Sequence, residues 1–169
     1  MASRPLQAFT LLHAATVSGL LFASGDEGGR ALPAANNAKW NTECASCHTL
    51  YHPALLPERS WRKLMEGLDR HFGENASLDA ATQKEIVEFL ASHAADRDNS
   101  RRGRKIAQSV PAAKTPLRIS ETGYFTHKHD EIRAAVWKRQ AIASKANCAA
   151  CHSGAEQGNF DEHGVRIPR

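Results

Sequence analysis

The sequence contains little methionine, few aromatic residues and no strong excess of charge. Two of its 169 residues are methionine, Met1 and Met65, and aromatic residues make up 7%. They are not interleaved with a basic stripe, as they would be in a protein that binds single-stranded nucleic acid. The formal net charge is a mild +4 with histidine neutral. The composition therefore gives no support to nucleic acid as a partner, and we expect none.

Long apolar runs are absent beyond the N-terminus. Residues 8–23 ("AFTLLHAATVSGLLFA") are apolar or small apart from His13, and they follow "MASRPLQ", which carries Arg4 and no acid. A membrane-spanning helix needs roughly 20 apolar residues, and Ala23 and Gly25 provide the small residues of a cleavage site. We therefore expect a signal peptide over 1–25 rather than a membrane anchor. The mature protein is expected in the periplasm, with no segment that spans the membrane.

Cysteine is confined to four positions, all within a repeated motif. The chain reads "CASCH" at 44–48 and "CAACH" at 148–152. Two cysteines separated by two residues and followed by histidine form the attachment signature of haem c. The thiols add to the two vinyl groups of the porphyrin, and the histidine binds the iron from one face. We expect a helix to begin at or beside the first cysteine. The repeat predicts two covalently bound haem c groups, held by Cys44, Cys47, His48, Cys148, Cys151 and His152.

Disulfide bonds and a structural zinc site are the alternatives for four cysteines. Export permits disulfides, but they leave the histidine after each pair unexplained. A structural zinc site usually separates its two Cys-x-x-Cys units by about 15 to 20 residues, whereas about a hundred residues intervene here. A redox-active Cys-x-x-Cys pair would not need two copies, each followed by histidine. Haem attachment accounts for all of these features.

The second axial ligand of each iron is predicted to be histidine. Histidine and methionine are the candidates, and the choice influences the reduction potential. Met65 lies on the apolar side of an expected helix and is interpreted as a packing residue. Six histidines lie beyond the signal peptide and outside the two motifs: His52, His71, His93, His127, His129 and His163. This surplus favours two bis-histidine haems with fairly low reduction potentials.

His71 and His93 compete for the first site. His71 follows Leu64 and Leu68 at helical spacing, so its imidazole should point into the interior, where an iron would satisfy a buried nitrogen. His93 also follows an apolar stripe. It lies near a helix C-terminus, however, where a protonated histidine is stabilised without any metal. We therefore favour His71.

His127 and His129 compete for the second site. His129 shares a helical face with Ile132 and Val136, and His127 would point elsewhere if the helix already includes it. We therefore favour His129. Closing a short loop costs slightly less entropy than closing a long one, which favours pairing His48 with His71 and His152 with His129, although a crossed pairing stays open.

His52 and His163 are expected to be solvated rather than to bind iron. His52 precedes a proline, and His163 lies in a polar C-terminal tail.

The fold is predicted to be mostly α, with long loops. Apolar spacing predicts helices over 61–72, 79–95 and 128–140. The segment 97–116 is polar and basic, ends in prolines, and is interpreted as a linker or surface loop. It separates an N-terminal haem-binding half, 26–96, from a C-terminal half, 117–169. Large apolar side chains are few for two separate protein-only cores, so we expect one haem-filled core shared by both halves.

The predicted function is electron transfer. Two axial histidines leave no open site for a substrate, and no constellation of catalytic acid, base or nucleophile stands out. We therefore expect an electron carrier and not an enzyme. The alternative is a haem enzyme or gas sensor with one open or labile axial site, of the peroxidase or small-ligand reductase type.

The chain also resembles a known family, the bacterial dihaem cytochromes c called DHC. The likeness covers nearly the whole mature chain and rests on "ECASCH", "PALLPERSW", "LDRHFGENASL", "RISET", "HDEI", "NCAACH" and "VRIPR". It implies two covalent bis-histidine haems in a small periplasmic electron carrier, with ligands at His71 of "RHFG" and His129 of "HDE". It further implies haem-protein partners, including an oxygen-binding monohaem cytochrome and membrane cytochromes b.

Overall fold

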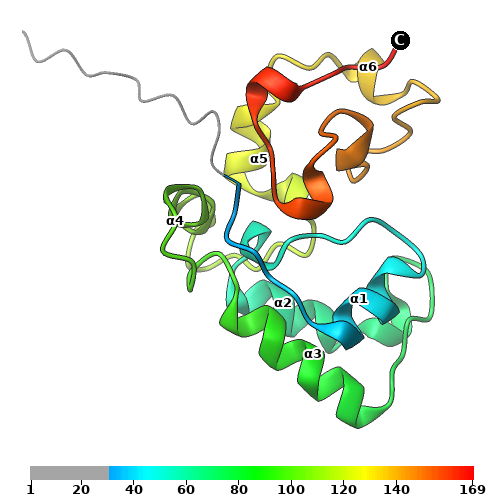
Figure 1. Cartoon of the computed structure of the whole chain (residues 1–169), viewed down its shortest axis with the longest axis vertical. Helices are drawn as coiled ribbons and strands as arrows, with labels where there is room; N and C mark the ends of the chain where they lie inside the picture. Colours follow the sequence, from blue (N-terminus) through cyan, green and yellow to red (C-terminus); the bar gives the residue numbers. More distant parts are fainter. Residues whose placement is uncertain (1–30) are drawn as a thin grey trace, which may run out of the picture.

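The computed structural model describes residues 31–169, so the expected signal peptide, 1–25, lies outside the described residues. The described chain consists of helices, short 3-10 turns and loops (Figure 1). This confirms the mostly helical fold. The α-helices are α1 (Ala38–Ala45), α2 (Glu58–Met65), α3 (Ala80–Ser92), α4 (Arg101–Gln108), α5 (Gly123–Lys128) and α6 (Ala134–Trp137). The 3-10 turns are η1 (Pro53–Leu55), η2 (Leu68–Arg70), η3 (Ile119–Glu121), η4 (Cys148–Ala150), η5 (Ala155–Gln157) and η6 (Glu162–Gly164).

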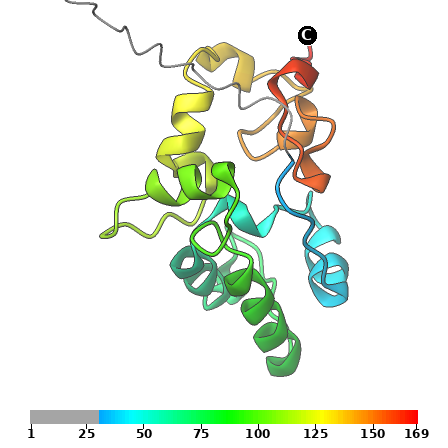
Figure 2. The ribbon, with the colours of Figure 1, turned by 60° about the vertical axis from the view of Figure 1, so that its left-hand side comes forward.

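The helices form two parts that meet beside α4. Helices α1, α2 and α3 lie together in one part, and α5, α6 and the C-terminal turns form the other (Figure 1). The turned view places α4 at the junction of the two (Figure 2). The segment before α1 reaches the C-terminal part, where the Leu32 N–H donates to the Gly158 carbonyl over 3.0 Å. Across residues 31–169, every helix is too short or too polar to cross a lipid bilayer.

The N-terminal part has a core of buried side chains contributed by α1, α2, α3 and the segments adjoining them. The rings of Trp40 on α1 and Phe89 on α3 have centroids 5.1 Å apart. The Trp61 indole is also buried, and its N–H donates to the Pro53 carbonyl over 2.6 Å. The buried cluster comprises Trp40, Leu56, Trp61, Met65, Leu68, Ile86, Phe89, Leu90 and Ala94. Met65 therefore packs in the core, as expected.

The C-terminal part buries far fewer side chains. Among the described residues beyond Val110, the buried hydrophobic side chains are Phe125, Ile142 and Ala155. Its two α-helices have only six and four residues. Helices this short have little stability of their own and depend on tertiary packing. Haem was expected to supply apolar interior surface to both halves. The C-terminal part, which buries few side chains of its own, depends on it more than the N-terminal part does.

Helix α3 agrees with the expected helix over 79–95, but the other two expected helices differ. Asp79 caps α3 by accepting hydrogen bonds from the N–H groups of Ala81 and Thr82. The expected helix over 61–72 ends at Met65, and a 3-10 turn follows. The expected helix over 128–140 is confirmed only at α6, Ala134–Trp137. The preceding helix, α5, is capped by Thr122 and ends at Lys128, so residues 129–133 lie outside both helices.

The basic segment 97–116 contains a helix, α4, where a linker or loop was expected. Ser100 caps α4 by accepting from the Gly103 N–H over 3.0 Å. A Cβ on Gly103, in the first turn of α4, would lie 2.5 Å from a carboxylate oxygen of Asp98, so this helix turn can lie against Asp98 only with glycine at that position. Ile106 is 2% exposed and anchors the helix against η1. Ile106 is the one buried side chain of α4, and a single apolar residue in a basic segment does not form the apolar periodicity from which a helix is predicted.

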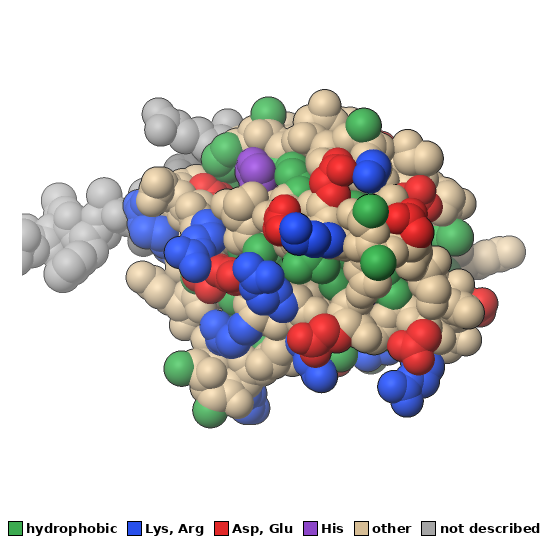
Figure 3. All heavy atoms as spheres, turned by 90° about the horizontal axis from the view of Figure 1, so that it is seen from below, with side chains coloured by type: hydrophobic (Ala, Val, Ile, Leu, Met, Phe, Trp, Pro, Cys, Tyr) green, Lys and Arg blue, Asp and Glu red, His purple; other side chains and the backbone are tan. Residues whose placement is uncertain are grey.

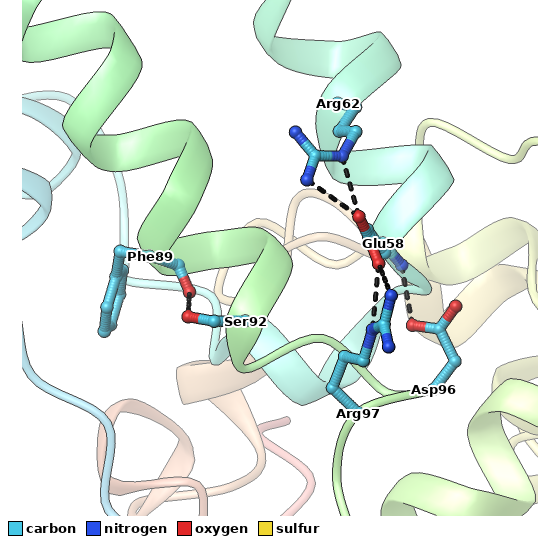
Figure 4. A network of polar contacts seen from close by, with 6 residues as sticks. All are labelled: Glu58, Arg62, Phe89, Ser92, Asp96 and Arg97. Carbon is cyan, nitrogen blue, oxygen red and sulfur yellow. Dashed lines mark hydrogen bonds and ion pairs between the residues drawn. The ribbon is translucent and has the colours of Figure 1, made fainter.

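Glu58 ties the start of α2 to the chain that follows α3 (Figure 4). Its carboxylate accepts hydrogen bonds from Arg62 over 2.8 Å and from Arg97 over 2.7 Å. Its backbone N–H donates to Asp96 over 2.8 Å. Hydrogen bonds from Arg97 and then Arg62 lower the pKa of Glu58. Elsewhere on the face seen from below, Lys and Arg side chains lie interspersed with Asp and Glu (Figure 3).

His52 is buried, so the expectation that it is solvated was wrong. Its side chain is 5% exposed. Nε2 donates to the Pro33 carbonyl over 2.7 Å, and Nδ1 accepts from the Ala54 N–H over 3.1 Å. A Cβ on Gly158 would lie 3.0 Å from its ring. The histidine therefore joins the segment before α1, turn η1 and the C-terminal part. The bond from the Ala54 N–H requires the neutral form, because Nδ1 must be unprotonated to accept it.

We expect His52 to make the protein less stable as the pH falls. Burial lowers the pKa of His52 below 6.5, partly offset by the Pro33 hydrogen bond and the nearby Asp98, while His93 lowers it further. Below pH 6.5 the unfolded chain therefore binds a proton that the folded chain excludes, which favours unfolding. His52→Gln should lower the free energy of unfolding by about 1 to 3 kcal/mol at neutral pH. This difference, measured by denaturant unfolding, should shrink at pH 5, and a constant difference would contradict the assignment.

Candidate haem-binding sites

The first motif begins in the last turn of α1. Asn37 caps this helix by accepting from the Trp40 N–H over 2.9 Å, and Trp40 fixes it to the core. Cys44 lies in the last turn, where it packs against the core, and Cys47 is exposed just beyond. The expectation that a helix begins at the first cysteine was therefore wrong for this motif. The helix ends there and presents the motif beside the apolar cluster.

The first site brings His48 and His71 together. Their ring centroids are 6.1 Å apart, and the ring planes differ by 26°. His48 Nδ1 donates to the Thr49 carbonyl over 2.8 Å, which leaves Nε2 free. His71 follows η2 directly, and the chain turns sharply after it through Phe72 and Gly73, which have φ angles of 53° and 107°. The position of His71 thus comes from a turn rather than from the face of a long helix.

The second site brings His129 and His152 together. Their ring centroids are also 6.1 Å apart, but the planes are nearly perpendicular, at 79°. His129 caps the C-terminal end of α5, where its Nδ1 donates to the Phe125 carbonyl over 2.8 Å and its ring stacks on Phe125. Turn η4 begins at Cys148, whose carbonyl accepts from the His152 N–H over 2.8 Å.

A cavity that is open to solvent adjoins the second site. His129, His152 and both cysteines of the motif line it. Most of its other lining is apolar or aromatic, including Phe125, Ile132, Val136, Trp137, Ile142 and Phe160. This lining suits a flat apolar ring.

The spacing of both histidine pairs fits two ligands on opposite sides of one metal ion. With metal–nitrogen bonds of about 2 Å, the centres of two such imidazoles lie roughly 6 Å apart. His48 and His129 each use Nδ1 for a backbone carbonyl, which leaves Nε2 for a metal. His152 Nδ1 is buried and has no hydrogen-bond partner. The residues of both sites therefore fit haem.

Burial shifts the pKa of several groups at the two sites toward the uncharged form. Burial, and then the neighbouring His48, lower the pKa of His71. Burial, followed by His129 and Arg102, lowers the pKa of His152. Burial raises the pKa of Cys44 to about 11 and also raises that of the Cys148 thiol. Neutral imidazole is the form that binds a metal.

The competing histidines differ from His71 and His129 in their ring neighbours. His93 ends α3 with Nδ1 2.9 Å from the Phe89 carbonyl, an arrangement like that of His129, but its ring lies beside that of Phe89, whereas the ring of His129 also lies beside that of His152. His127 is 80% exposed and faces Asp130 across 3.9 Å. His163 is largely exposed beside Asp161, in keeping with the solvated position expected for it.

Alternative uses of the cysteines find no support in the structure. No disulfide bond joins any two of the four cysteines. In the part of the chain from residue 31 onward, no group of three or more His, Cys, Asp and Glu side chains could hold a metal ion such as zinc. Aromatic side chains around the sites had not been singled out from the sequence. Phe125, four residues before His129, was detectable in principle from that helical spacing.

A helical chain with two separate Cys-x-x-Cys-His units is the architecture of a c-type cytochrome with two haems. The family model for dihaem cytochrome c matches residues 40–160, and the chain belongs to this family. The protein therefore carries two covalently bound haem c groups, and its four cysteines fit the two attachment motifs. Members of the family are typically exported electron carriers with redox partners.

Solved structures of two bacterial proteins agree with this assignment. The diheme cytochrome c from Rhodobacter sphaeroides is 43% identical, with a TM-score of 0.67, over 76% of this chain and 100% of that one. The diheme cytochrome type c from Shewanella baltica OS155 is 38% identical, with a TM-score of 0.65, over 78% of this chain and 93% of that one. No curated protein matches the chain.

Proposed function

We propose that the protein is a periplasmic electron carrier whose two haem irons are each bound by two histidines. His48 and His71 would bind one iron, and His129 and His152 the other. Each of the two halves, 26–96 and 117–169, then supplies every ligand of one site. The observation that carries this proposal is the 6.1 Å spacing between ring centroids in both pairs.

Bis-histidine ligation supports electron transfer at low potential. Each haem supplies an iron that takes up and releases one electron. Two nitrogen donors stabilise the oxidised iron better than a histidine–methionine pair does. The carbonyl partners of His48 and His129 increase the basicity of these imidazoles and fix their planes. With these four histidines as ligands, both axial positions would be filled by protein and no position would be left for a substrate, which favours an electron carrier over an enzyme.

The partners are proposed to be other redox haem proteins. An oxygen-binding monohaem cytochrome and a membrane cytochrome b are the candidates that the family resemblance offers. The sequence pattern of residues 1–25 supports export to the periplasm.

Carbon monoxide and electron paramagnetic resonance test the ligation. Reduced protein should form no rapid carbon monoxide adduct, because both irons are six-coordinate. Oxidised protein should give two low-spin signals. The near-parallel rings of the first site split the iron d orbitals that they overlap, which predicts an ordinary rhombic signal. The near-perpendicular rings of the second site leave these orbitals almost degenerate, which predicts a highly anisotropic signal.

A rapid carbon monoxide adduct at either haem in the unaltered protein would overturn the proposal. It would favour a haem enzyme or gas sensor with an open or labile axial site. A high-spin ferric signal of full intensity would have the same meaning.

A further inference from the structure

We propose that Tyr51 connects the two haem sites and sets the rate at which an electron passes between them. This inference rests on the proposed electron-carrier function. Tyr51 lies in the loop between the first motif and η1, half-buried against the N-terminal core. Its ring centroid is 5.0 Å from that of His48, with 33° between the planes. One side chain of the N-terminal part thus lies against a proposed iron ligand.

The hydroxyl of the same tyrosine reaches the second attachment motif. It donates to the Ala146 carbonyl over 2.9 Å, across 95 residues of sequence. The same carbonyl accepts from the N–H of Cys148 over 2.9 Å. Ala146 therefore receives two hydrogen bonds, one from each part of the molecule. A continuous series of contacts runs from the ring of His48 through Tyr51 and Ala146 to Cys148, which attaches the second haem.

This series favours electron tunnelling between the sites. Tunnelling falls off less steeply along covalent and hydrogen bonds than across empty space, so a bonded bridge raises the rate at a given separation. His48 and His152 would each hold one of the two irons between which a single electron passes, in either direction, and the contacts of Tyr51 would link these two ligands. Tyr51 is neither oxidised nor deprotonated in this transfer. It acts as a bridge and as a positioning residue for the ring of His48.

Two substitutions separate the contributions of the ring and the hydroxyl. Tyr51→Phe removes only the hydrogen bond to Ala146, and Tyr51→Leu also removes the ring beside His48. After rapid reduction of one haem by pulse radiolysis, the rate of exchange between the haems should fall severalfold in Tyr51→Phe and further in Tyr51→Leu. Both reduction potentials, measured by equilibrium titration, should change little in Tyr51→Phe, so a change in driving force would not explain the slower rate.

A spectroscopic measurement adds a readout that is independent of the rate. The paramagnetic signal of the His48 site should broaden in Tyr51→Leu, because the imidazole plane loses its neighbour. The signal of the second site should keep its shape. Ser92→Ala is the matched control. It also removes one hydroxyl that donates to a backbone carbonyl, that of Phe89 over 3.0 Å, but Ser92 lies at the end of α3 and outside both attachment motifs, so exchange between the haems should keep its native rate.

The two proposals fail in different ways. Native exchange rates in both Tyr51 variants would overturn the bridge while leaving the bis-histidine assignment intact. A carbon monoxide adduct in the unaltered protein would overturn the assignment and leave the comparison of exchange rates valid. If Tyr51→Leu does not fold, Tyr51→Phe alone decides, because it keeps the packing of the ring.

Discussion

Replacing Cys148 and Cys151 with serine is expected to unfold the C-terminal part of the protein while the N-terminal part stays folded. The reason is the unequal distribution of buried side chains. Beyond Val110, three hydrophobic side chains of the described chain are buried, and the helices there have six and four residues. The cavity beside the second motif is lined mainly by apolar and aromatic side chains, which would meet water without a haem ring. Exposure of such surface is the dominant penalty against a folded state.

Hydrogen exchange followed by mass spectrometry measures this outcome segment by segment. In the variant, mass should show one haem, and amides of residues 119–142 should exchange as in an unfolded chain. Amides of α3 should keep their protection, because α2 and α3 pack around Trp61, Ile86 and Leu90 without using the second motif.

The matched variant replaces Cys44 and Cys47 with serine. Cys44 packs against a core that protein side chains already form, so this change should lower stability without abolishing the helices α2 and α3. Native protection over 119–142 in the Cys148 and Cys151 variant would show that the C-terminal part folds without covalent haem, and would contradict the expectation.

The features that could be predicted from the sequence are those encoded over short distances. Each haem-attachment motif spans five residues and depends on covalent chemistry, so the surrounding fold does not alter its meaning. Helix α3 was also predictable, because Asp79 caps it and its apolar face includes Ile86, Phe89 and Leu90. Thirteen residues give a periodic pattern enough length to be recognised.

The features that could not be predicted depend on long-range contacts. His52 preceding a proline looks like a surface residue, but its partners are Pro33, 19 residues earlier, and the region of Gly158. Helix α4 is anchored mainly by Ile106, whose partners lie on η1 and before α1. The residues next to His52 and Ile106 in the sequence contain no information about these distant partners. The prediction therefore followed local propensity, which gave a solvated histidine and a loop.

His129 shows how a preferred residue can be placed by a different cause from the one expected. It was assigned to the inner face of a helix over 128–140, in phase with Ile132 and Val136. The structure ends α5 at Lys128, so that phase does not apply. What holds the His129 ring is the carbonyl and ring of Phe125, four residues earlier. Thr122 is the N-cap of α5, because its side chain accepts a hydrogen bond from the N–H of Phe125, three residues later. A search of the sequence for N-cap residues could have used this threonine to place the start of the helix.

His71→Ala and His129→Ala should each open one iron to external ligands. Removing the second nitrogen donor leaves a five-coordinate iron, which predicts a high-spin ferric signal and a rapid carbon monoxide adduct at one haem per protein. The loss also destabilises the oxidised iron. The reduction potential of that haem should therefore rise by on the order of 0.1 V, a fraction of the roughly 0.8 V range over which axial ligands tune haem. Spectroelectrochemical titration measures the shift.

His93→Ala and His127→Ala are the matched controls, because each removes a histidine that competed for one of the two sites. His93 binds the Phe89 carbonyl at the end of α3, and His127 is 80% exposed. Both variants should keep two low-spin signals, both potentials and indifference to carbon monoxide. In His71→Ala the anisotropic signal of the second site should remain, and in His129→Ala the rhombic signal of the first should remain. A five-coordinate haem in His93→Ala but not in His71→Ala would show that His71 is not the ligand. The same result in His127→Ala but not in His129→Ala would rule out His129, although the rings of His71 and His129 each lie 6.1 Å from a motif histidine.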